Sequence, residues 1–464
     1  MSGSAGLQQR PLALLVAGAF FMEILDGTII APAAPHIAAE FGVGAVDINV
    51  AITAYVLTLA VLIPISGWLA DRYGARRVFT AALVVFTLAS AACAAAPSLP
   101  VLTAARVLQG AGGAMMVPVG RLVVLRTTAK TDLVRAIAYL TWPALTAPVV
   151  APVLGGVLSE YASWRWIFVI NVPLGLVALV LARRLVPDLR AEDVGRLDRR
   201  GFVLTAIGVG ALVVGMESLG AGEPRWPVVA GALVVAAVLL GSAVRHLLRS
   251  PRPLVDLRIL RVATFRVTAV SGSVFRAVIT AVPFLLPLFF QLGFGWTAAE
   301  AGAVVIALFL GNVGIKPVTT PLMRRFGIRT VLLGAVVASA ACLVAIAFLQ
   351  ASTPLPVLLA VLALSGIFRS IGFTAYNSVA FADVEQARMT HANTLMSTLQ
   401  ELGAGLGVAV GALLVRLGAA IGPVPDGDGP FRVAFVLLAV LLVVPAIEGV
   451  LMARAAGDAV TGRA

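Results

Sequence analysis

One short segment occurs twice in the chain: WLADRYGARRVF at residues 68–79 and PLMRRFGIRTVL at residues 321–332. Aligned without gaps, the copies are identical at five of their 12 positions, and each carries three arginines around one glycine. Each copy also follows a long apolar run. The repeat predicts that the second half of the chain duplicates the architecture of the first. The alternative is a common basic turn that recurs by chance.

The composition indicates a membrane protein. The chain has 464 residues, of which 60% are hydrophobic and 12% are charged, and its mean hydropathy is +1.02. Soluble domains are roughly 25% charged, so this chain has too few charged side chains to cover several soluble domains. A bilayer core of about 30 Å needs roughly 20 helical residues, and fourteen apolar runs reach that length. The expected spans are 12–34, 47–69, 78–97, 99–125, 133–159, 166–186, 201–220, 226–246, 264–291, 299–323, 328–349, 354–381, 392–416 and 431–453.

The basic residues follow the alternation expected of an inserted bundle. Twenty-five of the 34 Lys and Arg residues fall in alternate connecting segments, which we assign to the cytoplasm together with both termini. The net charge of +12 therefore reflects topology and does not indicate a nucleic-acid partner. The first run could also be a signal peptide, but Glu23 and Asp26 interrupt it.

These patterns predict an all-α membrane protein with 14 transmembrane helices, arranged as six, two and six. Residues 12–186 form an N-terminal six-helix bundle, and residues 187–263 form a two-helix insert with its cytoplasmic loops. Residues 264–453 form a C-terminal six-helix bundle, followed by a cytoplasmic tail at 454–464. We expect the insert to lie outside the transport core.

Four motifs, one of which overlaps the first copy of the repeat, resemble those of a known family. They are LDGTIIAPAAP at 25–35, GWLADRYGARR at 67–77, RVLQG at 106–110, and APVLGG at 151–156 followed by WRWIFVINVPLG at 164–175. In this order they resemble the motifs of the major facilitator superfamily, in its fourteen-span drug:proton antiporter branch, and the resemblance covers essentially the whole chain. The sequence departs from the family pattern at Ala31, Ala151 and Arg324. The first departure puts polar substrate contacts in doubt.

The resemblance implies that Asp26 and Arg106 take part in proton coupling. Charges at membrane depth are expensive and mark functional candidates, and Glu23 lies on the same helix face as Asp26 because the two are three residues apart. Asp26 is about 12 Å and Arg106 about 9 Å from the outer ends of their spans, so their depths nearly match. We therefore expect Asp26, modulated by Arg106, to be the proton switch, with Glu23 as a further candidate. A fixed structural ion pair is the alternative.

The resemblance also implies a gating loop and a hinge. The gating loop would hold one access state through contacts of its charged side chains with neighbouring helix ends and acidic groups. Its residues are Gly67, Asp71, Arg72, Gly74, Arg76 and Arg77. The hinge that limits proton leak would consist of Pro148, Pro152, Gly155 and Gly156, for which close helix packing is a compatible explanation.

The second half contributes candidates for a substrate cavity. Its spans hold the bases Arg276, Lys316 and Arg369 and the acid Glu401, and adding Arg106, Glu23 and Asp26 of the first half gives four bases against three acids. This surplus favours anionic, zwitterionic or neutral cargo over lipophilic cations, unless the bases pair structurally; Lys316 is the base expected to snorkel to the interface. The cavity candidates are Gln109, Arg276, Arg369, Glu401, Phe21, Phe289 and Tyr376.

The sequence thus predicts a proton-coupled exporter of small organic molecules, of multidrug efflux type, in the inner (plasma) membrane of the cell. The alternative within this class exports a specific metabolite or organic anion. We expect the proton gradient to supply the energy without a cofactor, because no nucleotide-binding motif is present, and we expect a monomer that binds lipid, protons and cargo but no nucleic acid. Cys93 and Cys342 form no metal motif. A membrane enzyme is disfavoured because His36, His246 and His391 are far apart and match no catalytic motif. A non-transporting sensor is the remaining alternative.

Overall fold

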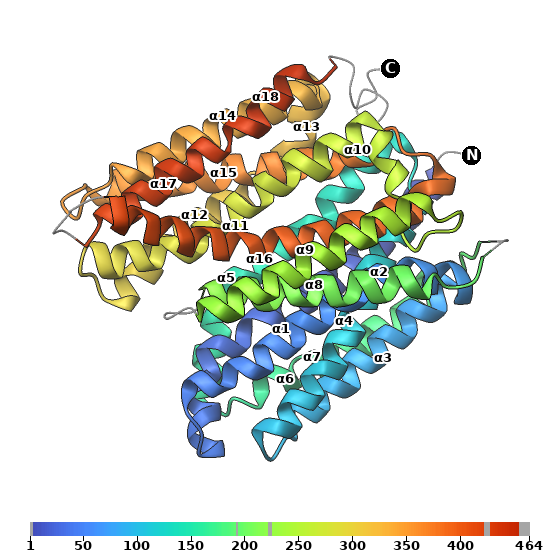
Figure 1. Ribbon diagram of the computed structural model, residues 1–464, viewed down its shortest axis with the longest axis horizontal. Coiled ribbons are helices and arrows are strands. Elements are labelled where there is room, and N and C mark those ends of the chain that lie inside the picture. The colour runs from blue at the N-terminus through green and yellow to red at the C-terminus, as the bar shows by residue number, and fades with distance from the viewer. Residues whose placement is uncertain (1–2, 192–193, 221–224, 422–426, 454–464) are drawn as a thin grey trace.

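The computed structural model describes residues 3–191, 194–220, 225–421 and 427–453, and over these residues it is helical without strands. Figure 1 shows long helices that run roughly along one axis. The N-terminal helices diverge from the C-terminal helices toward the left of the view. The all-α fold predicted from the sequence is confirmed.

The N-terminal bundle contains α1 to α7. Helix α1 packs along α5, and both α2 and α3 pack along α4, while α3 also contacts α7. A methyl group added at Gly112 of α4 would lie 2.8 Å from the Phe86 backbone nitrogen of α3, so a side chain there would separate the two helices. The helices are α1 (Gly3–Phe41), α2 (Asn49–Tyr73), α3 (Ala75–Ala94), α4 (Leu99–Thr127), α5 (Leu133–Tyr161), α6 (Trp166–Val169) and α7 (Asn171–Leu185), with short turns η1 (Ala45–Ile48) and η2 (Lys130–Asp132).

The C-terminal bundle repeats this plan. Helix α12 packs along α15, α11 along α16, and α14 along α15 and α17. Its elements are η3 (Leu257–Arg261), α10 (Ala263–Val267), η4 (Thr268–Gly272), α11 (Ser273–Leu288), η5 (Phe289–Gly293), α12 (Ala298–Gly314), α13 (Lys316–Phe326), α14 (Ile328–Ala347), α15 (Leu355–Ala380), η6 (Gln386–Arg388), α16 (Met389–Ile421), α17 (Gly429–Leu441) and α18 (Val443–Leu451).

The span count agrees with the sequence as far as it is described. Twelve helices of the described residues are long and apolar enough to cross a membrane, and the pair α12–α13 forms a thirteenth that is bent by 49°. The remaining expected span, 133–159, corresponds to the 29-residue helix α5, several of whose side chains lie outside the described set. Fourteen spans and cytoplasmic termini therefore stay predictions.

Three spans expected to be continuous are broken. The interruptions at Ile170, Ile315 and Leu442 each lie two or three residues before a proline: Pro173, Pro317 and Pro445 respectively. Proline lacks the N–H that would continue the helix and clashes with the carbonyl four residues earlier.

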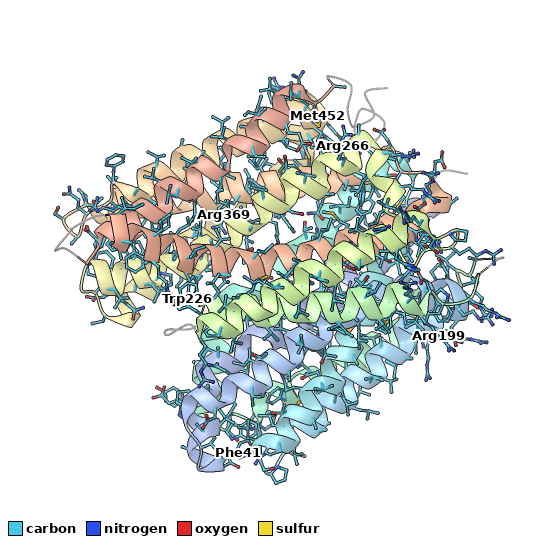
Figure 2. All side chains as sticks on the ribbon, viewed as in Figure 1. Phe41, Arg199, Trp226, Arg266, Arg369 and Met452 are labelled. Carbon is cyan, nitrogen blue, oxygen red and sulfur yellow. The ribbon has the colours of Figure 1, made fainter. Side chains whose placement is uncertain are left out.

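The charged ends of the helices gather on one side of the molecule. Figure 2 shows Arg199 and Arg266, both expected in cytoplasmic loops, at the end opposite Phe41 and Trp226, which are expected on the outer side. Arg369 lies between the two ends. This arrangement is the one expected if the basic loops share one face of the membrane.

The two-helix insert lies along the seam between the bundles. Helix α8 (Arg199–Gly220) pairs with α9 (Trp226–Arg249) and packs against α2 of the first bundle and α16 of the second. Val209 and Val213 of α8 form an apolar cluster with Ala60, against which Leu402 also packs. The insert thus contacts both bundles at the seam.

Asp198 ties the ends of the insert together. Its carboxylate accepts hydrogen bonds from the Gly201 N–H (2.8 Å) and the Leu254 N–H (3.2 Å), and it lies 2.8 Å from His246 Nε2. Burial raises the pKa of Asp198, but these hydrogen bonds outweigh burial and hold the pKa below its ordinary value. The ionised carboxylate is therefore the form that stabilises the fold.

Asp198→Asn is expected to lower stability at pH 7 by about 2 kcal/mol, because a neutral amide replaces a charged acceptor. Since the native pKa lies below the unfolded value of about 3.9, the stabilisation is present above that value and disappears as the pH falls through the native pKa. Thermal unfolding of both proteins in detergent, from pH 7 down to about one unit below the unfolded pKa, measures the difference. Equal stability at pH 7 would contradict this role.

Gly366 allows α12 and α15 to touch. A methyl group added at Gly366 would lie 1.8 Å from the Leu308 carbonyl oxygen, whereas one added at Gly334 of α14 meets nothing within 4 Å. Gly366→Ala should therefore cost about 1–3 kcal/mol through overpacking, and Gly334→Ala should be neutral or stabilising through helix propensity. Thermal unfolding of the two variants in detergent tests this, and equal effects would contradict it.

Candidate functional site

A buried ion pair lies inside the N-terminal bundle. The fully buried carboxylate of Asp26 in α1 accepts a hydrogen bond from Arg106 Nη1 of α4. It also accepts hydrogen bonds from Gln109 Nε2 and Asn171 Nδ2, each at 2.7 Å. The structure thus brings Asp26 and Arg106 together, as their similar depths predicted, and joins α1, α4 and α7 at one carboxylate.

The surroundings of Arg106 fix its guanidinium. Arg106 Nη1 also donates to Gln109 Oε1 at 2.8 Å, which is possible because the two residues are three apart on one helix face. The guanidinium carbon lies 4.0 Å from the centre of the Tyr55 ring. Gln109 Nε2 continues the network to Ser90 Oγ at 2.8 Å. Gln109, expected as a substrate-cavity candidate, is fully buried as part of this hydrogen-bond network.

Glu23 lies outside this network and faces the other bundle. Its side chain is 8% exposed and interacts electrostatically with Glu401 of α16 as well as with Asp26. Its backbone carbonyl accepts a hydrogen bond from Tyr55 Oη at 3.2 Å. Tyr55 therefore contacts both the Glu23 backbone and Arg106, which is the partner of Asp26.

The gating loop joins the two bundles. Asp71 Oδ1 lies 3.0 Å from Arg126 Nη1 of α4. Thr390 of α16 accepts a hydrogen bond from Arg126 at 2.5 Å and donates one to Asp71 at 3.2 Å. Gly67 is required here, because an added methyl group would lie 2.3 Å from Thr394 Oγ1. These contacts hold α2 and α4 against the start of α16.

The rest of the loop differs in part from expectation. Arg76 Nε donates to the Val186 carbonyl at the end of α7, at 2.5 Å, as predicted for a helix C-terminus. Gly74 has φ of +91° at the turn between α2 and α3, a conformation that favours glycine. Arg72 and Arg77 are exposed, as Arg76 is, and the similar contacts expected of them stay a prediction.

The expected hinge is described only in part. A methyl group at Gly155 would lie 2.6 Å from the Ile29 carbonyl oxygen, so this glycine permits close packing of α5 on α1. Gly156 has open space around its Cα. The side chains of Pro148 and Pro152 lie outside the described set. The described residues therefore support packing, and the leak-limiting role stays a prediction.

Arg121 forms a second link between the bundles, and the sequence analysis gave it no role. From α4, Arg121 Nε donates to Asn393 Oδ1 at 2.9 Å and Nη1 donates to Gln400 Oε1 at 2.6 Å, both on α16. Gln400 Nε2 in turn donates to Asn377 Oδ1 of α15 at 2.6 Å. The polar residues on α15 and α16 were the available signal, but their partner is more than 270 residues away in the chain.

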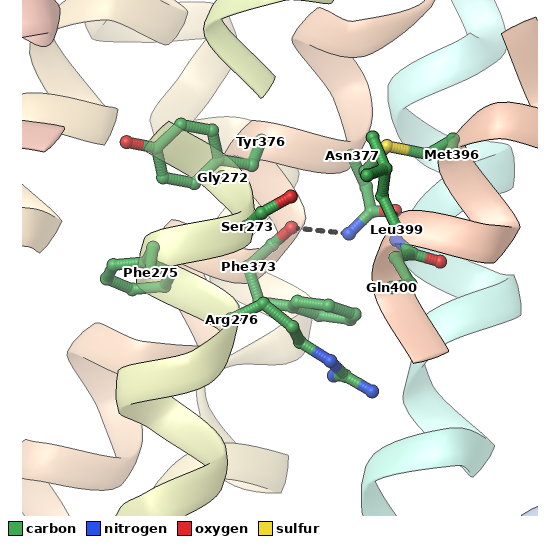
Figure 3. Close-up of a pocket in the computed structure, with 10 residues that line it drawn as sticks. All are labelled: Gly272, Ser273, Phe275, Arg276, Phe373, Tyr376, Asn377, Met396, Leu399 and Gln400. Atoms are coloured by element: carbon green, nitrogen blue, oxygen red, sulfur yellow. Dashed lines mark hydrogen bonds between the residues drawn. The ribbon is translucent and has the colours of Figure 1, made fainter. Parts of the chain in front are cut away.

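A small pocket lies beside this link. Figure 3 shows Arg276 of α11 reaching past the Phe373 ring, with Tyr376 above and Gln400 across the pocket. The Arg276 guanidinium carbon is 4.9 Å from the centre of the Phe373 ring. Arg276 also interacts electrostatically with Glu401. Two of the cavity candidates, Arg276 and Tyr376, thus line this pocket, and Glu401 interacts with Arg276 without lining it.

Three further residues singled out in the sequence do not line this pocket: Lys316, Phe289 and Phe21. Lys316 does not snorkel: it is 6% exposed, and its Nζ donates to Thr374 (2.6 Å) and to Thr141 of α5 (3.3 Å), because the bend before Pro317 turns it toward the first bundle. Phe289 does not line the pocket, because it is fully buried among other phenylalanines, including Phe435 at 5.5 Å. Phe21 is half-buried against an apolar cluster of the first bundle.

Arg106→Gln would leave the Asp26 carboxylate buried without its counter-charge. Loss of one partner of a buried pair costs about 3–5 kcal/mol, so we expect a marked fall in the unfolding temperature in detergent. Asp26→Asn combined with Arg106→Gln removes both charges and should be more stable than Arg106→Gln alone. A double variant no more stable than the single one would contradict mutual compensation.

Comparison with known sequences and structures shows which proteins this chain resembles. A sequence model of the Major Facilitator Superfamily matches residues 16–408 and 268–455. The predicted multidrug resistance protein MdtD of Serratia proteamaculans is 34% identical over 459 residues, which cover 97% of this chain and 94% of that protein. MdtD of Cronobacter sakazakii, likewise a predicted multidrug resistance protein, is 37% identical over 447 residues, covering 93% and 92%. The crystal structure of the transporter FucP in its outward conformation aligns with a TM-score of 0.66 at 14% identity, covering 96% of this chain and 99% of that one.

Proposed function

Because the chain belongs to the major facilitator superfamily, we propose that it is a drug-efflux transporter driven by proton entry through alternating access. The relatives named as multidrug resistance proteins span nearly the whole chain, which supports efflux of small organic molecules. The chain is a multi-pass membrane protein, and its bacterial relatives favour the inner membrane. We further propose that it works as a monomer, with the proton gradient as its energy source and no bound cofactor.

The observation that carries proton coupling is the Asp26 network. The ionised carboxylate is held by donors from Arg106, Gln109 and Asn171 in a place where no charge would lie without a partner. Protonation of Asp26 removes the attraction to Arg106, and the guanidinium is then free to shift toward other partners. A change in one proton therefore alters the contacts among α1, α4 and α7.

The contacts between the bundles support alternating access. Asp71, Arg126 and Thr390 close the seam at the end that carries the basic loops, and Gly67 lets the helices touch there. The bundles diverge away from this end in Figure 1. This arrangement fits a conformation closed to the cytoplasm. Breaking the Asp71 contacts would open the opposite state.

Export of a specific organic anion is the second candidate. It is favoured by one observation: the bases buried between the bundles outnumber the acids there. Among the described residues, the bases Arg121, Arg276, Lys316 and Arg369 outnumber the acids Glu23 and Glu401 once Asp26 is paired with Arg106.

Proton flux in inverted vesicles tests the proposed function. Vesicles with an acidic lumen receive rhodamine 6G, a xanthene cation, or sulforhodamine B, an anion on the same scaffold, and lumenal pH is recorded. Wild type should release protons on addition of at least one dye, and Asp26→Asn should abolish the release. Asp383→Asn makes the same change at an exposed site and should behave as wild type.

Flux that persists in Asp26→Asn would remove Asp26 from the mechanism and leave Glu23 as the proton carrier. Dye binding without proton flux or dye uptake in the wild type would indicate a sensor and contradict export.

A further inference from the structure

The cationic side chains between the bundles lack carboxylate partners. Among the described residues, Arg121 and Arg369 make hydrogen bonds only to amide or carbonyl oxygens, and none of Arg121, Arg276 and Arg369 forms a salt bridge. Arg369 is 7% exposed and Arg121 is 6% exposed. This differs from the N-terminal bundle, where Arg106 has Asp26 as its counter-charge.

Several of the guanidinium donors have no acceptor. Within the part of the chain that the structure describes, four of these donor atoms are buried without a hydrogen-bond partner: Arg276 Nε, Arg121 Nη2, and both Nε and Nη1 of Arg369. A buried donor that has lost its water and gained no acceptor destabilises the structure, and a charged donor does so more strongly. A ligand that supplies oxygen acceptors would remove this penalty.

The charges around these donors favour an anion. Arg276 and Arg369 are close enough to repel each other. Glu401 is the acid that interacts with both Arg276 and Arg121, and it also faces the like charge of Glu23. Even with both acids ionised, the three arginines outnumber them, and Lys316 adds a further positive charge. This cluster of side chains therefore carries excess positive charge.

The apolar lining of the pocket indicates the chemistry of the uncharged part of the ligand. The pocket beside Arg276 is lined by Phe373, Tyr376, Met396 and Leu399. Aromatic rings and a methionine side chain suit a flat ring system that stacks or packs edge-on. The planar guanidinium fork suits a carboxylate or sulfonate, which it can bind through two parallel hydrogen bonds.

We propose that the transported cargo includes aromatic organic anions, and that Arg276, together with Arg369 and Arg121, binds their carboxylate or sulfonate group in the pocket between α11, α15 and α16. This inference rests on the proposed export function. Since Arg121 already holds Asn393 and Gln400, an anion that draws Arg121 toward it weakens the link between α4 and α16. Cargo binding would thereby loosen the seam without touching the Asp26 network.

Dye binding to the purified full-length protein in detergent tests the anion site. Fluorescence anisotropy titrations with sulforhodamine B and rhodamine 6G compare wild type with Arg276→Gln and with Arg225→Gln, which makes the same change at an exposed outer position. Arg276→Gln should weaken sulforhodamine B binding about tenfold, the loss of roughly one charge-assisted contact. Rhodamine 6G binding should not weaken, and Arg225→Gln should bind both dyes as wild type does.

Glu401→Gln is expected to increase the affinity for sulforhodamine B, a result that misfolding of the variant would not produce. It removes the acid that competes for Arg276 and Arg121, so sulforhodamine B should bind several-fold more tightly. Unchanged or weaker binding in Glu401→Gln, equal binding in Arg276→Gln and wild type, or no sulforhodamine B binding to wild type would each overturn the anion site.

The vesicle measurement separates this inference from the function on which it rests. Rhodamine 6G export without sulforhodamine B binding would overturn the anion site and leave export intact. Arginine-dependent sulforhodamine B binding without proton flux for either dye would support the site and contradict proton-driven export.

Discussion

The ion pair between Asp26 and Arg106 is the interaction on which the N-terminal bundle depends. A lipid environment offers no water to buried charges, so a buried charge without a partner destabilises the fold. The carboxylate of Asp26 meets this requirement with donors from α4 and α7, and the Arg106 guanidinium also lies on the Tyr55 ring of α2. Four helices are therefore positioned around one pair. A change in its charge cannot remain local.

The two bundles differ in how their buried charges are paired. In the first bundle the acid and the base neutralise each other, which suits a site that exchanges a proton. In the second bundle Arg276 and Arg369 have aromatic rings and carbonyl groups around them but no salt-bridge partner among the described residues. The division suggests separate places for the proton and for the cargo. Arg121 and Lys316 cross the seam between them, so the contacts that hold the bundles together would couple the two proposed sites.

The sequence predicted those features that depend on position along a helix. Span limits follow from apolar length, and the pairing of Asp26 with Arg106 follows from depth, which is counted in residues. The sequence did not predict the direction in which each side chain points, because that direction depends on how each helix is rotated against its neighbours. Phe289 was therefore expected in the cavity although it packs against Phe435. Lys316 was misplaced because the bend before Pro317 redirects it, and Arg121 was missed because Asn393 and Gln400 lie far along the chain.

The central claim is that Asp26 is a proton switch and not a fixed structural pair. Proton release on cargo binding tests it most directly: purified protein in weakly buffered detergent solution is mixed with sulforhodamine B, and the pH change is followed with an indicator. Linkage between cargo binding and protonation predicts release of up to about one proton per bound dye in the wild type. Asp26→Asn, which has no titratable group at that position, should bind the dye and release none. Equal proton release from both proteins would contradict the account.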